Sequence, residues 1–196
     1  MKNLFKISVL TFALVAGLMI NAKAQETPAV NQTTTTKTGS GIRLSIGPDL
    51  SLPVGSFHDR YNLGFGGSVQ ADFPIMQDQL FVTVNGGFQN YFAKDINGRS
   101  GKDLQMIPAK AGLKYFPVKS FYVQGEAGAG FLTNKNNVGA TKSTTFIYAP
   151  QIGYLIPLGG QNFLDAGVRF EGNTKFTENG KSNNLFGLRI AYSFSL

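Results

Sequence analysis

Apolar and polar side chains alternate with a period of two from residue 42 to the end of the chain. In the first run, Ile42, Leu44 and Ile46 alternate with Arg43 and Ser45. Because successive side chains of a β-strand point to opposite faces, this period predicts strands with one apolar and one polar face. The pattern recurs in eight runs, each about 9–12 residues long, without helical periodicity between them, so the predicted fold class is all-β. The runs cover residues 42–52, 63–73, 80–89, 107–115, 121–131, 146–154, 164–171 and 186–194.

The connections between these runs alternate in length. Those after the second, fourth and sixth runs are short and begin with a proline, namely Pro74, Pro117 and Pro157. Short turns at one end and long loops at the other predict an antiparallel up-and-down meander, in which each proline ends a strand. The long connections are residues 53–62, 93–103, 133–143 and 173–183.

The sizes of the side chains decide which face points outward. The polar face is rich in Gly and Ser, whereas the other face carries bulky Leu, Ile, Val, Phe and Tyr. The interior of an eight-stranded barrel is just wide enough for side chains, so the small residues belong inside and the bulky apolar face requires lipid. A water-facing outer surface would instead carry Lys, Glu and Thr. The sequence therefore predicts an eight-stranded antiparallel up-and-down transmembrane β-barrel over residues 42–196.

Composition agrees with a wall of this kind. Only 15% of the residues are charged and the mean hydropathy is −0.04, which is the average expected of a lipid-facing face and a polar interior. Aromatic residues near the strand ends are expected to form girdles at the two membrane interfaces. These residues are Phe73, Tyr91, Phe92, Tyr115, Phe116, Phe121, Phe131, Tyr154, Phe163, Tyr192 and Phe194.

Ten charged residues fall on the inward face, five of each sign. Since unpaired charge in a narrow lumen is costly, we expect a salt-bridged plug and not an ion pathway. Loss of Glu126 alone is expected to strand a cation, at a cost of about 3–5 kcal/mol. The inward charges are Arg43, Asp49, Asp72, Lys110, Lys114, Glu126, Asp165, Arg169, Glu171 and Arg189.

The first 24 residues have the pattern of a secretory signal peptide. Basic residues precede the apolar run 7–20, and a small-x-small pattern ends at Ala24, so we expect export through the Sec pathway and cleavage between Ala24 and Gln25. The apolar run is shorter than the ~20 residues that a spanning helix needs, which disfavours an anchor. Residues 25–41 are rich in Thr, Gly and Ser and predict a flexible lead-in.

Residue counts exclude several kinds of function. The chain has no Cys and one His, so we expect no metal site and no cofactor. Three of its 18 basic residues lie in the signal peptide, which leaves 15 against 11 acidic residues, without the basic clusters that nucleic-acid binding requires. An enzyme is not expected. The alternative rests on a resemblance in size to lipid A-modifying barrels, which use a His with a Ser and an acid. Here His58, Ser56 and Asp59 would supply this set, but they are loop neighbours without a further motif.

Three segments carry a resemblance to a known family: the turn 52–57 (LPVGSF), the strand 107–116 (IPAKAGLKYF) and the end Ala191-Tyr192-Ser193-Phe194. They resemble the small outer-membrane β-barrel family common in Bacteroidetes-type bacteria, which is similar to the transmembrane domain of OmpA and to OmpX. The resemblance covers residues 42–196. It implies an outer-membrane location in a Gram-negative bacterium and recognition of the aromatic end, Tyr192 and Phe194, by the barrel assembly machinery. Here Ser195-Leu196 follows Phe194, where most such barrels end on an aromatic residue.

The long loops carry the remaining functional prospect. Their charges sum to about +4, which favours contact with outer-membrane lipid and the phosphate-rich lipopolysaccharide surface, and an extracellular ligand remains open. We therefore expect a monomeric outer-membrane barrel with a structural or surface-interaction role, such as adhesion or binding. A porin-like channel for small solutes is the alternative.

Overall fold

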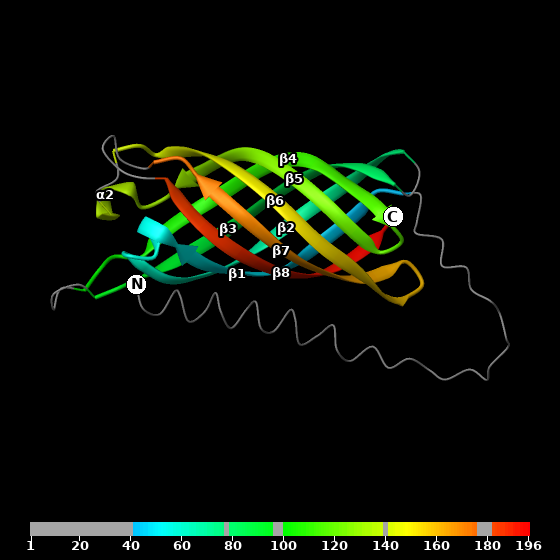
Figure 1. The fold of residues 1–196 in the computed structure, drawn as a ribbon, viewed down its shortest axis with the longest axis horizontal. Helices are drawn as coiled ribbons and strands as arrows, with labels where there is room; N and C mark the ends of the chain where they lie inside the picture. The colour runs from blue at the N-terminus through cyan, green and yellow to red at the C-terminus, as the bar shows by residue number, and fades with distance from the viewer. Residues whose placement is uncertain (1–40, 77–78, 96–99, 139–140, 176–181) are drawn as a thin grey trace, which may run out of the picture. The chain divides into compact units, whose positions relative to one another are not determined.

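The computed structural model describes residues 41–76, 79–95, 100–138, 141–175 and 182–196. Eight antiparallel strands close into one barrel in chain order, with β8 pairing back onto β1 (Figure 1). The predicted eight-stranded up-and-down barrel is confirmed. The strands are β1 (Arg43–Val54), β2 (Tyr61–Met76), β3 (Leu80–Ala93), β4 (Leu104–Val118), β5 (Phe121–Leu132), β6 (Thr144–Gly159), β7 (Asn162–Asn173) and β8 (Asn183–Ser195).

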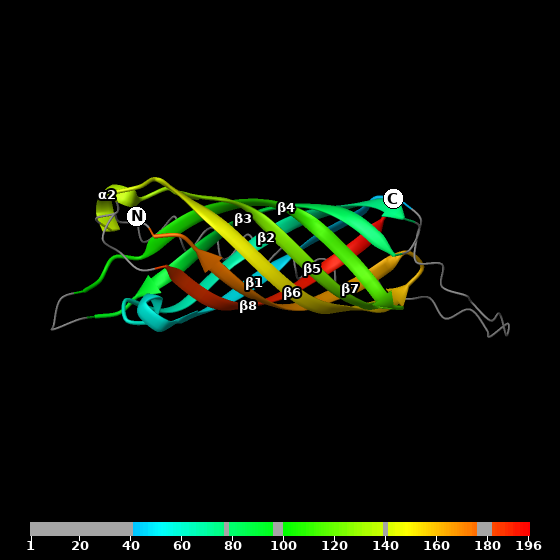
Figure 2. The same ribbon diagram turned by 45° about the horizontal axis from the view of Figure 1, so that its top comes forward.

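The two ends of the barrel differ, as the alternation of connection lengths predicts. At the turn end, three short connections, 77–79, 119–120 and 160–161, join the strands. At the loop end lie the connections 55–60, 94–103, 133–143 and 174–182. Figure 2 shows the C-terminus at the turn end and α2 at the loop end.

Two short helical elements lie in the loops, where the sequence predicts none. They are the 3-10 helix η1 (Gly55–Phe57) and the four-residue helix α2 (Lys135–Val138). Both are too short to produce a helical hydrophobic period, which explains why the sequence pattern misses them. Among the described residues, no helix is long and apolar enough to cross a membrane.

The strands are longer than predicted, with 12 to 16 residues each, and the prolines do not end them. Pro74 pairs with Phe81 and Pro157 pairs with Phe163, so the ladder continues past both residues. Each of the three prolines lies at or beside a register shift next to its turn. A register shift disrupts the regular ladder locally, and prolines, which lack an N–H donor, are tolerated in sheets at such positions.

The two faces of the wall follow the predicted alternation. On β1, for example, Arg43 and Asp49 are fully buried, whereas Ile46 and Leu50 are about 40% exposed on the outside. Exposed apolar side chains of the same kind occur on all eight strands. An outer surface of this composition is rare on soluble proteins, which avoid large apolar patches.

Three of the aromatic residues assigned to the girdles point inward instead. Tyr91, Phe116 and Phe163 are between 1% and 5% exposed and pack inside the barrel. The period of two, extended to the strand ends, places all three on the inward face. Tyr91, Phe116 and Phe163 each lie two residues from an inward side chain, namely Gln89, Lys114 and Asp165 respectively. Their position near strand ends was the misleading signal.

The inward glycines make room for large interior side chains. A Cβ atom at Gly153 would collide with the Tyr122 ring, and one at Gly167 would lie 2.7 Å from the Tyr122 hydroxyl. A Cβ at Gly187 would lie 2.9 Å from the Arg169 side chain. Contacts this short cannot be relieved inside a filled lumen without displacing the larger side chain. The abundance of glycine therefore permits the interior to hold its Tyr and Arg residues.

Candidate functional site in the barrel interior and at the loop end

The turn-side ion group consists of Asp72, Lys114, Asp165 and Arg189, each at most 1% exposed. The Lys114 ammonium lies 2.8 Å from Asp72 and 3.4 Å from Asp165, and the Arg189 guanidinium lies 3.3 Å from Asp165. The Tyr122 hydroxyl donates to Asp165 at 2.6 Å. Each charge therefore has an opposite charge or a polar donor at hydrogen-bond distance, as burial of charge requires.

The loop-side ion group forms a chain of contacts across the lumen. Asp49 lies 2.8 Å from Arg169, and Arg169 lies 3.3 Å from Glu171. Glu171 lies 3.5 Å from the Lys110 ammonium, which lies 3.3 Å from Glu126. These five residues come from β1, β4, β5 and β7, so the group ties together strands that are not neighbours in the wall.

Two apolar clusters enclose the ion groups. The loop-end cluster is Phe57, Tyr61, Tyr91, Leu104, Met106, Leu132, Ile147 and Leu185. The turn-end cluster is Phe81, Phe116, Tyr122, Leu155 and Phe163. Phe57 belongs to η1, so this short helix turns a loop side chain into the barrel, where its ring packs against Tyr61 and Tyr91 at 4.9 and 5.1 Å.

Arg43 lies among the aromatic rings of the turn-end cluster. Its guanidinium carbon lies 5.0 Å from the ring centre of Phe81, 5.6 Å from Phe116 and 5.5 Å from Phe163. Rings at these distances attract a cation through their negative faces. Phe116 and Phe163, two of the three inward aromatic residues expected in the girdles, therefore help to surround the Arg43 guanidinium.

All ten predicted interior charges are buried, and the structure divides them unevenly. The turn-side ion group holds two cations and two carboxylates, whereas the loop-side ion group holds two cations and three carboxylates. Arg43, in the aromatic cluster, completes the balance of five against five. Sequence alone gives the sum but not this division.

The other predicted site residues lie elsewhere. Tyr192 and Phe194 are on the outward face of β8, with ring centres 6.1 Å apart. Their recognition by the assembly machinery stays a prediction. Ala24 and Gln25 are outside the described residues, as is the lead-in up to residue 40, so the cleavage site and these boundaries also stay predictions.

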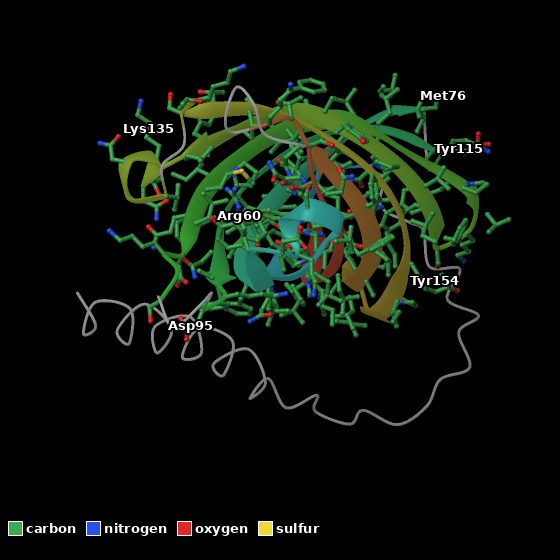
Figure 3. The ribbon with its side chains drawn as sticks, turned by 60° about the vertical axis from the view of Figure 1, so that its left-hand side comes forward. Arg60, Met76, Asp95, Tyr115, Lys135 and Tyr154 are labelled. Carbon is green, nitrogen blue, oxygen red and sulfur yellow. The ribbon has the colours of Figure 1, made fainter. Side chains whose placement is uncertain are left out.

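The loop end carries two clefts lined by basic residues. The larger, of about 740 Å³, is lined in part by Ser56, Lys142, Thr174 and Lys175. The smaller, of about 300 Å³, includes Arg60, Lys94 and Lys102 in its lining. Figure 3 shows Arg60 and Lys135 at this end, and Met76, Tyr115 and Tyr154 at the opposite one. Among the described residues, neither lining contains an acidic side chain.

The residues of the alternative catalytic site do not form a hydrogen-bonded set. The Ser56 hydroxyl donates to the main-chain oxygen of Ser182 at 3.2 Å, and His58 is exposed. Over the described parts of the chain, no hydrogen bond joins His58 to Ser56 or Asp59. Likewise, the described residues contain no group of three or more His, Asp or Glu side chains placed to hold a metal ion.

Solved structures with the same fold are outer-membrane proteins. OprG of Pseudomonas aeruginosa is 11% identical, with a TM-score of 0.51, covering 80% of this chain and 96% of that chain. Ail, the attachment invasion locus protein of Yersinia pestis, is 15% identical, with a TM-score of 0.50, and the match covers 80% of this chain and 100% of that chain. Neisserial surface protein A is 15% identical, with a TM-score of 0.52, and the match covers 80% of this chain and 98% of that chain. At these identities the likeness concerns the fold.

No curated protein matches the sequence. The model of the family described as "Outer membrane protein beta-barrel domain" matches residues 10–194, which is nearly the whole chain. The apolar exterior and the charged interior of the barrel agree with this match, since lipid surrounds such a wall and the lumen is polar. The chain belongs to the outer membrane protein beta-barrel domain family, and it is a transmembrane β-barrel of the outer membrane.

Proposed function

We propose that the protein is a closed, non-catalytic barrel that presents a basic binding surface at the outside of the cell. The observation that carries this proposal is the filled lumen, in which two ion groups lie between two apolar clusters. A solute crossing the barrel would have to separate buried ion pairs and displace packed aromatic rings at both ends. Removing one member of a buried pair costs about 3–5 kcal/mol, so such a passage is unfavourable.

The binding surface is the loop end, which faces away from the cell because outer-membrane barrels place their longer loops outside. Its described cations are Arg60, Lys94, Lys102, Lys135, Lys142 and Lys175, and its described carboxylates are Asp59, Asp95 and Asp103. An excess of positive charge attracts anionic surfaces and speeds their association. The favoured partner is the phosphate-rich lipopolysaccharide of the membrane that surrounds the barrel.

A related fold supports an anionic partner. The Ail barrel of Yersinia pestis has been solved in complex with the heparin analogue sucrose octasulfate, a densely charged sugar. The present chain offers the same kind of chemistry at its two basic clefts, where Lys and Arg side chains meet without a carboxylate among the described lining residues. Cationic side chains bind phosphate and sulfate oxygens through charge-assisted hydrogen bonds.

Three measurements on the purified, refolded barrel test this proposal. In planar bilayers without lipopolysaccharide, we expect no discrete conductance steps, and regular steps would overturn the closed lumen. In nanodiscs of zwitterionic lipid, we expect binding of lipopolysaccharide that weakens as salt rises, because exposed charges are screened. Absence of binding at low salt would overturn the surface role. Lipid A that keeps its mass after incubation with the protein is the result expected of a non-catalytic barrel.

A further inference from the structure

The smaller basic cleft is built from three separate segments of the chain. Arg60 ends the connection before β2 and Tyr61 begins β2; Lys94, Gly101 and Lys102 come from the connection between β3 and β4, and Val138 from α2. Its volume of about 300 Å³ is at the lower end of the range for small-molecule sites. A cleft of that size has room for a ligand about as large as one sugar unit.

Main-chain contacts fix the segments that carry the three cations. The Lys94 N–H donates to the Arg60 carbonyl oxygen at 2.8 Å, which holds these two residues side by side. A Cβ atom at Gly101 would lie 2.6 Å from the Lys94 carbonyl oxygen, so the residue before Lys102 approaches the Lys94 main chain closely. The main chain beneath the cationic side chains is therefore held in place, so binding a ligand between them orders the side chains and not the backbone.

The carboxylate next to Lys102 in this frame is already engaged. Asp103 accepts from the Ala93 N–H at 3.0 Å and from the Asn90 side-chain amide at 3.2 Å, using one oxygen for each. Within the described part of the chain, no salt bridge includes Arg60, Lys94 or Lys102. The fold thus brings three like charges to one cleft, and an anion there relieves their repulsion.

We propose that this cleft binds the phosphate monoester of a sugar. A phosphate monoester carries about −1.5 to −2 charges and three acceptor oxygens, which match one guanidinium and two ammonium groups. The planar guanidinium of Arg60 can engage two of these oxygens at once, and the lysines add point charges. Tyr61 and Val138 provide apolar surface for the carbon atoms of the sugar ring. The inference rests on the proposed surface function and names its ligand and site.

Glucose 6-phosphate is a suitable soluble probe, with glucose as the uncharged comparison. In a ¹⁵N-labelled barrel in zwitterionic nanodiscs, we expect the phosphate ester to shift the amide signals of Arg60, Lys94, Gly101 and Lys102, and glucose to leave them in place. The variant R60Q/K94Q/K102Q should bind the ester at least about tenfold more weakly, since its charge-assisted hydrogen bonds are lost. Equal shifts with glucose would overturn the proposal.

The variant K142Q/K175Q, in the larger cleft, is the matched control and should keep the affinity for glucose 6-phosphate. If it loses affinity as much as the triple variant, the ester binds by diffuse charge and the specific site is wrong. Unchanged electrophoretic heat-modifiability of both variants will show that they remain folded barrels.

Competition identifies the source of the phosphate. Lipopolysaccharide that displaces the probe points to the lipid of the same membrane, whereas binding of the probe without such displacement points to a soluble ligand; both results support the site. If the triple variant still binds both lipopolysaccharide and glucose 6-phosphate, the site is wrong but the proposed surface function stands. If the unaltered protein does not bind lipopolysaccharide at all, the proposed surface function is wrong.

Discussion

The ammonium group of Lys110 lies 3.3 Å from the carboxylate of Glu126, inside the barrel and shielded from water. Lys110 also contacts Glu171 at 3.5 Å, so it has two carboxylate partners. The expectation from sequence that loss of Glu126 strands a cation therefore does not hold. Loss of Lys110 would instead leave Glu126 without a cation, because Lys110 is its salt-bridge partner among the described residues.

The first prediction compares the two members of this pair. Lys110→Met leaves Glu126 buried without its cation and should lower the free energy of unfolding by about 3–5 kcal/mol. Glu126→Gln leaves Lys110 with Glu171 and brings the loop-side ion group to two charges of each sign, so its cost should be below about 1.5 kcal/mol, that of one hydrogen bond. Urea unfolding in lipid vesicles measures both. Equal losses would contradict the assigned partners.

The second prediction concerns the space occupied by Tyr122. Gly153→Val places side-chain atoms where the Tyr122 ring lies and should separate its hydroxyl from Asp165, at a cost of about 1–3 kcal/mol for overpacking. Gly125→Val is the matched control, because Gly125 faces outward on β5 and a Cβ atom added there would meet open space, with nothing within 4 Å. The same unfolding assay should show little change for the control. A stable Gly153→Val barrel would show that the interior can rearrange.

The third prediction tests the aromatic end of the chain as an assembly signal. Phe194→Ala should reduce the folded, heat-modifiable fraction in cells, while the purified protein should still refold into vesicles, where no assembly machinery is present. Phe186→Ala removes another outward ring of β8, about half exposed, and should leave assembly in cells unaffected. Equal effects of the two substitutions in cells would count against specific recognition.

The fourth prediction concerns export. Mass spectrometry of the protein isolated from outer membranes should find Gln25 as the first residue, and replacement of Ala24 by Leu should slow processing, because the cleavage site requires small residues. A mature chain that retains Met1 would contradict the signal peptide.

The period of two determines much of the fold because it is a local property of the chain. Side chains alternate between faces along any strand, so Asp49, Lys110 and Glu171 can be placed inside without knowing their neighbours. The alternation also places Tyr91, Phe116 and Phe163 inside, provided that it is extended to the strand ends. Helices as short as η1 and α2 leave no period to detect, and Phe57 is turned into the barrel by one of them.

Sequence by itself thus determined the number of strands, their inward and outward faces, the two unlike ends and the balance of interior charge. Tertiary structure alone decided which charges meet. Lys110 and Glu171 are 61 residues apart, and they come together because strand tilt and the stagger of the closed barrel set the height of each inward side chain. The pairing of β2 with β3 and of β3 with β4 brings Arg60, Lys94 and Lys102 to one cleft, which the period of two along each strand does not encode.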